Sequence, residues 1–316
     1  MKNNSTKANK LNEISWIRLM LYCMGAALFF RVFVLELFGI PSSSMENTLL
    51  VGDNVLVSKW HYGARTPQAP LMWPFSHQNI LGLPIPSFSK WLEIPMFRLP
   101  GFSSPKCGDV MVFNGPFQKQ LPVEQREYFI KRCVALPGDT LAIRNKILYI
   151  NHQKSAFQGV LKQDKQIRKQ GEIFYKPNSE INELHNFIYD KNKHWNADWM
   201  GEFTVPFKGM KININPATIA IYAKSILKDE GYMPLNDKPR ALLKDDQIWI
   251  DQKRIYSYTF KNDYFFMMGD NRNFSHDSRF WGFLSEKHIV GKAICLGLSF
   301  DSNGNVRWDR VGMQIE

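Results

Sequence analysis

The longest apolar stretch of the chain lies near its N-terminus. Residues 1–13 are polar and basic, and residues 19–30 carry no charge. The range 14–40 is long enough for a helix to span a bilayer if its charged residues lie near the ends and extend toward water. The pattern therefore predicts a single transmembrane helix over 14–40. A cleaved secretory signal and a buried core helix are the alternatives.

The basic residues of the N-terminal tail predict the orientation of this helix. Lysines next to a membrane span favour the cytoplasmic side, and the tail contains Lys2, Lys7 and Lys10. We therefore expect residues 1–13 in the cytoplasm and everything after residue 40 on the outer face of the membrane.

Beyond the span, the alternation of apolar and polar residues predicts a mainly β protein. Short runs with a period of two, bounded by turn residues, are typical of strands. We expect strands within 50–57, 110–113, 127–136, 264–268 and 291–298, a hairpin over 247–258 and one helix over 217–230.

Two segments do not fit the strand pattern. Residues 64–106 are rich in Pro, Trp and Phe and lack periodicity, which indicates an ordered extended loop or a segment that dips into the membrane interface. Residues 153–202 are polar and weakly patterned, as expected of an inserted subdomain with a short helix near 179–189. The β domain would then comprise residues 41–152 and 203–316, with 64–106 as a loop insertion.

Composition and charge narrow the function only slightly. The chain has 316 residues, is 44% hydrophobic and carries a net charge of +11. Its basic residues are scattered along the sequence, so we expect no nucleic-acid partner. The four cysteines show neither a C-x-x-C pair nor metal-ligand spacing, which indicates buried free thiols, no metal site and no cofactor.

Three consecutive serines stand directly behind the apolar segment. Ser42, Ser43 and Ser44 follow Pro41, and such a run is usually a solvated turn. Here a predicted strand follows, so the serines lie at the mouth of a sheet. A hydroxyl held there can be a nucleophile only if a base removes its proton.

A lysine inside a predicted strand is the candidate base. Lys131 lies between Phe129, Ile130 and Val134, and it points away from Arg132 because successive strand residues face opposite ways. An exposed lysine has a pKa near 10.4 and cannot accept a proton at neutral pH, but apolar burial lowers that pKa by several units. The alternative is a strand lysine whose amine reaches water.

A third block follows an apolar strand near the C-terminus. The turn Gly269-Asp270-Asn271-Arg272 precedes Ser275, Asp277, Ser278 and Arg279. A Gly-Asp-Asn turn is common, and its charges could simply pair with one another.

Taken together, the three blocks resemble the type I signal peptidases of the bacterial inner membrane. The matching residues are Pro41–Met45 with Thr48, Leu49, Gly52 and Asp53, then Tyr128–Arg132 with Leu136–Asp139, and last the block from Gly269 to Arg279, with Gly108-Asp109-Val110 between the first two. The resemblance leaves 64–106 and 153–260 unaligned. It implies an antiparallel β fold shared with self-cleaving repressors, one N-terminal transmembrane helix and an inserted subdomain.

The resemblance also implies the roles of the site residues. Ser44 would be the nucleophile and Lys131 the general base. The backbone N–H of Ser44 and the hydroxyl of Ser42 would form the oxyanion hole, and Ser275 would orient the lysine. The residues implied as structural support are Arg132, Asp270, Asp277 and Arg279.

In this family the substrate binds extended and presents small, Ala-x-Ala-like residues to two shallow apolar pockets. The residues matching these pockets are Ile40, Pro41, Met45, Leu49, Phe129 and Ile130. The chain departs from the family at Phe129, where tyrosine is frequent, and at Ser43, where glycine is common. The implied partners are signal peptides of exported preproteins and membrane lipid, and we expect a monomer in the bacterial inner membrane with its catalytic domain on the periplasmic face.

Two other functions compete with this interpretation. Self-cleaving repressor peptidases share the Ser-Lys arrangement, but they lack a membrane span and carry a DNA-binding head, for which residues 1–40 offer no candidate. A membrane-tethered binding or scaffold relative would keep the fold without turnover. Such a relative would normally have lost Ser44 or Lys131, and the chain retains both.

Overall fold

A computed structural model describes most of the chain. The described residues are 3–73, 76–80, 83–89, 91–117, 121–157, 162, 167, 169–170, 195–230 and 240–315. The short helix expected near 179–189 lies outside them.

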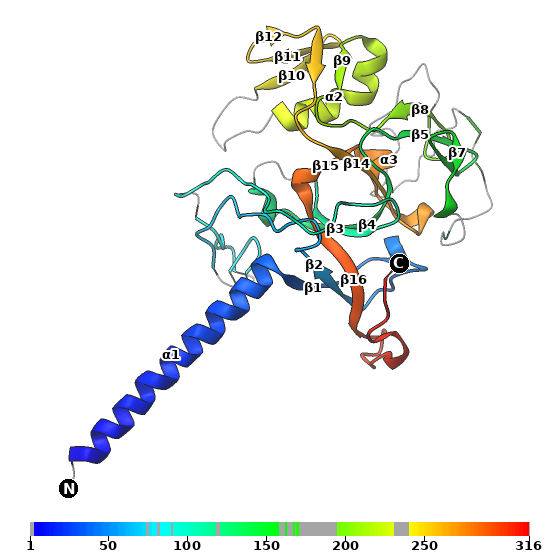
Figure 1. Cartoon of the computed structure of the whole chain (residues 1–316). Helices are drawn as coiled ribbons and strands as arrows, with labels where there is room; N and C mark the ends of the chain where they lie inside the picture. The colour runs from blue at the N-terminus through cyan, green and yellow to red at the C-terminus, as the bar shows by residue number, and fades with distance from the viewer. Residues whose placement is uncertain are drawn as a thin grey trace.

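The first element is a long helix, α1 (Asn3–Phe33), which extends away from the body of the molecule (Figure 1). Its segment Ser15–Phe33 has a mean hydropathy of 1.5, and its apolar stretch is not buried in the protein. Within the described part of the chain, this is the one helix long and apolar enough to cross a membrane. A bare apolar surface of this length agrees with the predicted anchor.

The helix begins earlier than the predicted range 14–40 and also ends earlier. It ends at Phe33, and Leu35–Gly39 forms strand β1, which pairs antiparallel with β2 (Asp53–Ser58). An apolar run without regular spacing does not distinguish a helix from a strand. The change of structure places Glu36 beside Arg31 and Lys59, whose nitrogens lie 2.9 and 2.7 Å from its carboxylate.

The centre of the molecule is a seven-stranded sheet in the order β1-β2-β16-β3-β4-β14-β15, and its neighbouring strands are antiparallel. The remaining strands of this sheet are β3 (Val110–Asn114), β4 (Tyr128–Ala135), β14 (Tyr264–Met268), β15 (Leu284–Ser285) and β16 (Ile289–Ser299). The five strands predicted from the sequence are therefore confirmed, as is the mainly β fold class.

Further strands cover the end of the molecule remote from α1 (Figure 1). A four-stranded sheet has the order β7-β6-β5-β8, and β10, β11 and β12 form a separate small sheet. The bounds are β5 (Thr140–Arg144), β6 (Ile147–Ile150), β7 (Gln153–Lys154), β8 (Met200–Thr204), β9 (Lys211–Asn213), β10 (Ala241–Lys244), β11 (Gln247–Ile250), β12 (Lys253–Arg254) and β13 (Ser257–Thr259).

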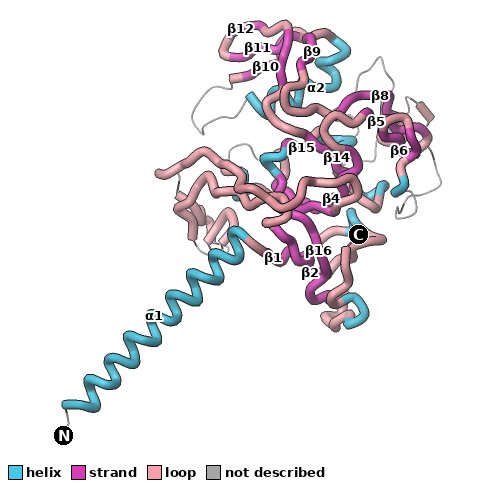
Figure 2. The backbone as a smooth tube through the Cα atoms, in the orientation of Figure 1, coloured by secondary structure: helices cyan, strands magenta, loops and turns pink. Residues whose placement is uncertain are grey.

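The predicted helix is confirmed as α2 (Pro216–Glu230). The predicted hairpin over 247–258 is confirmed for β11 and β12, whereas β13 pairs with β9 instead. The short helices are η1 (Ser43–Met45), η2 (Val123–Gln125), η5 (Arg272–Phe274), α3 (Ser278–Trp281), η6 (Glu286–His288) and η7 (Trp308–Arg310). Figure 2 shows how loops join these elements around the central sheet.

The central sheet is buried on both faces. On β3, Val110 and Val112 belong to one core cluster, while Met111 and Phe113 belong to another. Since neighbouring strand residues face opposite ways, the two clusters lie on opposite sides of the sheet. Side chains on both faces of β3 are therefore removed from water.

The described residues of 64–106 form an extended loop that folds back on itself. Isolated bridges join Arg65 to Arg98 and Met72 to Phe88. The loop is also fixed to η2, where Gln125 Oε1 accepts from the Gln78 N–H at 2.7 Å and Glu124 accepts from the Ala69 N–H at 2.8 Å. These contacts agree with the packed-loop prediction for the residues described.

Candidate active site

The serine segment, residues 40–49, is held between two anchored turns. After β1 ends, the Ile40 N–H donates to Asp53 O at 2.8 Å, and Ile40 O accepts from the Gly52 N–H at 3.0 Å. The chain then enters η1, and the Leu49 N–H closes the following turn onto Met45 O at 2.8 Å. Ser44 is buried within η1, with 7% of its surface exposed. The hydroxyl is thus fixed by the local backbone.

Lys131 reaches this hydroxyl from β4. Its Nζ lies 2.7 Å from Ser44 Oγ and 2.9 Å from the carbonyl oxygen of Ile130. The two residues are 87 positions apart in the sequence, and Lys131 is only 3% exposed. The predicted nucleophile and base therefore lie within hydrogen-bond distance.

The surroundings of Lys131 change its protonation. Burial lowers the pKa of the amine to about 8, against the opposing effect of the Asp277 and Asp270 carboxylates. Burial disfavours the charged ammonium because a low-dielectric interior solvates it poorly. Near pH 8 about half of the molecules carry a neutral amine that can accept a proton.

Ser42 lies on the same segment, and its Oγ is 3.4 Å from Ser44 Oγ. Ser275 is buried beside Gly269, where a Cβ atom would collide with Ser275 Oγ and the carbonyl oxygen of Ser44. The glycine therefore permits the third block to pack directly against the serine segment. Among the described residues, Lys131 and Ser275 form no direct hydrogen bond.

The predicted ion pairs brace this third block. Arg132 contacts Asp270 at 2.8 Å and Arg279 contacts Asp277 at 2.9 Å, with all four side chains buried. Asp277 also accepts from the Gly269 N–H at 3.1 Å. Although burial acts to raise it, the pKa of Asp277 is held below its usual value by Arg279. Both carboxylates are therefore anchored.

Asn271 is a bracing residue that sequence reasoning missed. Its N–H donates to Ser44 O at 3.1 Å, and its Nδ2 donates to Ser43 O at 3.0 Å. The sequence feature that could have indicated it is the Asn at the tip of the Gly-Asp-Asn turn, because Asn side chains in turns commonly form hydrogen bonds with the backbone. The third block thus holds both the ion pairs and the serine backbone.

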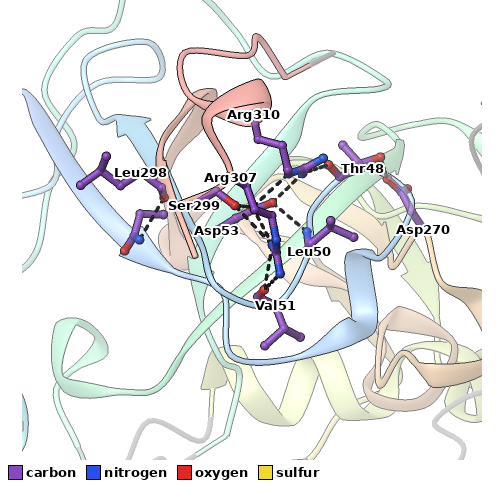
Figure 3. A network of polar contacts seen from close by, with 10 residues as sticks. Thr48, Leu50, Val51, Asp53, Asp270, Leu298, Ser299, Arg307 and Arg310 are labelled. Atoms are coloured by element: carbon purple, nitrogen blue, oxygen red, sulfur yellow. Dashed lines mark hydrogen bonds and ion pairs between the residues drawn. The ribbon is translucent and has the colours of Figure 1, made fainter. Parts of the chain in front are cut away.

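The C-terminal part of the chain fixes the other end of the serine segment (Figure 3). Arg310 contacts the buried Asp53 at 2.6 Å, and Ser299 Oγ donates to the same carboxylate at 2.7 Å. Asp53 in turn accepts from the Leu50 N–H at 2.8 Å. The turn after Leu49 is therefore stabilised from both sides.

A cavity of about 550 Å³ opens beside the Ser44–Lys131 pair. Four predicted pocket residues line it, namely Ile40, Pro41, Phe129 and Ile130, together with Ser42. Met45 and Leu49, the other two, are not among the lining residues because both are completely buried in the core cluster that contains Ile40.

His77 and Gln78 of the loop insertion also line this cavity. They were absent from the predicted site, because nothing in the sequence aligned this insertion with the rest of the chain. The loop insertion thus forms part of the cavity wall, in addition to the residues of the serine and lysine blocks.

Among the described residues, no group of His, Cys, Asp and Glu side chains is suited to hold a metal ion. All four cysteines are free, and Cys133 is buried. A hydroxyl, a buried amine of lowered pKa and nearby polar donors are the components needed for acyl transfer. The arrangement therefore contains the groups that a serine-nucleophile site needs.

Comparison with known proteins gives the family. The family model described as signal peptidase, peptidase S26, matches residues 13–297. A signal peptidase I from Buchnera aphidicola subsp. Acyrthosiphon pisum is 30% identical over 290 residues, covering 89% of this chain and 76% of the relative. One from Helicobacter pylori is 27% identical, covering 88% and 85%. The chain belongs to the signal peptidase family, peptidase S26.

Proposed function

We propose that this chain is a membrane-anchored serine endopeptidase that removes signal peptides from exported preproteins, cleaving after small, Ala-x-Ala-like residues. The observation that carries the proposal is the 2.7 Å separation of Ser44 Oγ and Lys131 Nζ beside a substrate-sized cavity. Family membership supports the substrate class.

The reaction begins with neutral Lys131. Its amine takes the proton of Ser44 as the oxygen attacks the scissile carbonyl. The Ser44 N–H and the Ser42 hydroxyl stabilise the oxyanion, and such donors each contribute about 3–4 kcal/mol to barrier lowering in comparable sites. The ammonium then protonates the departing amine as the C–N bond breaks. Water hydrolyses the acyl-enzyme with Lys131 again as base, which regenerates the serine hydroxyl.

The buried groups around the pair act by position. Ser275 would accept a hydrogen bond from the ammonium and keep it directed at Ser44. Arg132, Asp270, Asp277 and Arg279 support the loop that carries Ser275. None of the four takes part in proton transfer.

The substrate lies extended in the 550 Å³ cavity. Ile40, Pro41, Phe129 and Ile130 form shallow apolar pockets, which accept small side chains and reject large ones. Met45 and Leu49 shape these pockets from beneath, since both pack in the same cluster as Ile40.

The anchor places the reaction at the membrane surface. We infer that the span begins near residue 14, that residues 1–13 lie in the bacterial cytoplasm, and that the body works as a monomer on the periplasmic face with lipid around α1. The body comprises a catalytic β domain, 41–152 and 203–316, with 153–202 as an inserted subdomain.

Purified full-length protein in detergent tests the proposal. We expect cleavage of a preprotein after its Ala-x-Ala site, and a loss of at least 10³-fold in kcat/KM for Ser44→Ala and for Lys131→Ala. Ser43→Ala removes the neighbouring hydroxyl and should retain most activity. Full activity of Ser44→Ala or Lys131→Ala would contradict the dyad, and folded parent protein unable to cleave any preprotein would favour a binding role.

A further inference from the structure

A second cavity, of about 320 Å³, lies between the last turns of α1 and the loop insertion. Its apolar lining includes Leu28 and Val32 of α1 and Met72, Trp73 and Met96 of the insertion. Nothing in the proposed chemistry uses this cavity.

The second cavity adjoins the substrate cleft, which is the cavity beside Ser44 and Lys131, because His77 and Tyr128 line both. The His77 ring lies 5.0 Å from the Tyr128 ring, and the Tyr128 ring lies 4.8 Å from that of Phe38. These three rings form the boundary between the two cavities.

The insertion is built to hold His77 at this boundary. Gln78 has a φ of 60°, a left-handed conformation that non-glycine residues rarely adopt. The strained turn is retained by contacts on both sides, since the Gln78 N–H donates to the buried Gln125 at 2.7 Å and Gln78 O accepts from the Ser87 N–H at 2.8 Å. These contacts hold the turn in place and with it the neighbouring His77.

The distance along β4 and the position of α1 indicate which part of a substrate reaches the boundary. Tyr128 lies three positions before Lys131 on β4, about 10 Å at 3.3 Å per residue. β1 begins two residues after α1 ends, so this end of the cleft is the one nearest the membrane. An extended substrate cleaved at Ser44 therefore places its third or fourth upstream residue near Tyr128.

Three of the charged side chains that line the second cavity form one ion-paired cluster. Glu36 contacts Arg31 at 2.9 Å and Lys59 at 2.7 Å. A cavity lined mainly by apolar side chains favours an apolar occupant. The methionine side chains in the lining suit an apolar occupant because they adapt to varied apolar shapes.

We propose that the second cavity is a substrate subsite for the apolar residues about five to seven positions upstream of the scissile bond. Signal peptides carry an apolar stretch just before their small-residue cleavage site, so the two cavities match the two parts of one substrate. This inference rests on the proposed function, and it assigns the loop insertion a role in substrate selection.

Filling the cavity tests the proposal. Met96→Trp, with Met72→Trp as a second variant, is compared with Leu71→Trp, a control in the same loop whose side chain is outside the lining and 43% exposed. Each is assayed on a full preprotein and on a short peptide that begins four residues before the cleavage site. We expect kcat/KM for the preprotein to fall at least tenfold, mainly through KM, while cleavage of the short peptide stays within twofold.

Equal losses on both substrates, or no loss on either, would overturn the subsite. Failure of the parent protein to cleave either substrate would instead overturn the proposed function. A benzophenone cross-linker introduced at position 96 identifies the occupant in phosphatidylethanolamine and phosphatidylglycerol vesicles. Cross-linking to the preprotein is expected, whereas cross-linking to lipid that excess preprotein does not reduce would contradict the proposal.

Discussion

At the scale of single residues, the site depends on charges that are kept out of water. Lys131 has no carboxylate in direct contact among its hydrogen bonds within the described residues, so burial dominates and its pKa falls. Arg132, next to it in the strand, contacts Asp270 directly. Of these two neighbouring cations, Arg132 has a carboxylate in direct contact and Lys131 does not. Only Lys131 is therefore suited to accept a proton.

Arg132→Met should destabilise the fold by about 3–5 kcal/mol, because it leaves the buried Asp270 carboxylate without its cation. Urea denaturation of the purified protein measures the change. Arg240→Met provides the control, since Arg240 pairs with Asp251 in an exposed position and its loss should not shift the transition measurably. A similar shift in both variants would show that the buried Arg132–Asp270 pair contributes no more to stability than the exposed pair.

Ser44 and Lys131 could be found from the sequence because each stands in a short block with a recognisable order. Asn271 and His77 could not be assigned in this way. Their contacts with Ser43 O and the Tyr128 ring join segments distant in the chain, and such contacts depend on packing that local spacing does not encode.

At the scale of elements, the end of α1 and the start of β1 decide where the site lies relative to the apolar helix. The sequence predicted one continuous helix to residue 40, but pairing with β2 converts 35–39 into a strand. Apolar content identified the N-terminal helix correctly. The boundary depended on the partner strand and on Glu36, whose two cations come from α1 and from the residue that follows β2.

The loop insertion is expected to depend on Gln125. Gln125→Leu removes the acceptor for the Gln78 N–H and the Ser87 hydroxyl, leaving groups unpaired at about 1–3 kcal/mol each. Limited proteolysis should then cut within 64–106 at least tenfold faster, with Gln153→Leu, an exposed glutamine, as control. An unchanged cleavage rate would indicate that other contacts hold the loop.

At the scale of the whole molecule, the chain closes on itself around the serine segment. β16 lies between β2 and β3, and η7 places Arg310 against Asp53, 257 positions away in sequence. The antiparallel sheet could be predicted from alternation in its strands. The return of the C-terminal segment to the turn after Leu49 could not be predicted, because it depends on contacts with one buried carboxylate, that of Asp53.

Arg310→Met should lower the free energy of unfolding at pH 7 by about 2 kcal/mol, the scale of a hydrogen bond to a charged group. Although burial acts to raise it, the pKa of Asp53 is held below its usual value by hydrogen bonds from Arg310 and Ser299. A lowered pKa stabilises the fold above about pH 4 and loses that effect as pH falls through the folded value.

The difference between the Arg310→Met variant and the parent should therefore be largest at neutral pH and shrink on acidification below pH 4. Urea denaturation at a series of pH values measures it, with the exposed Arg254→Met as control. A difference that is constant across this pH range would contradict the role of Asp53.

The pH dependence of kcat/KM tests the central claim most directly. If neutral Lys131 is the base, log kcat/KM for a preprotein should rise by one unit per pH unit at low pH and level off above an apparent pKa of about 8. A midpoint near 6.5, the value of an ordinary histidine, or near 10.4, that of an exposed lysine, would contradict the account.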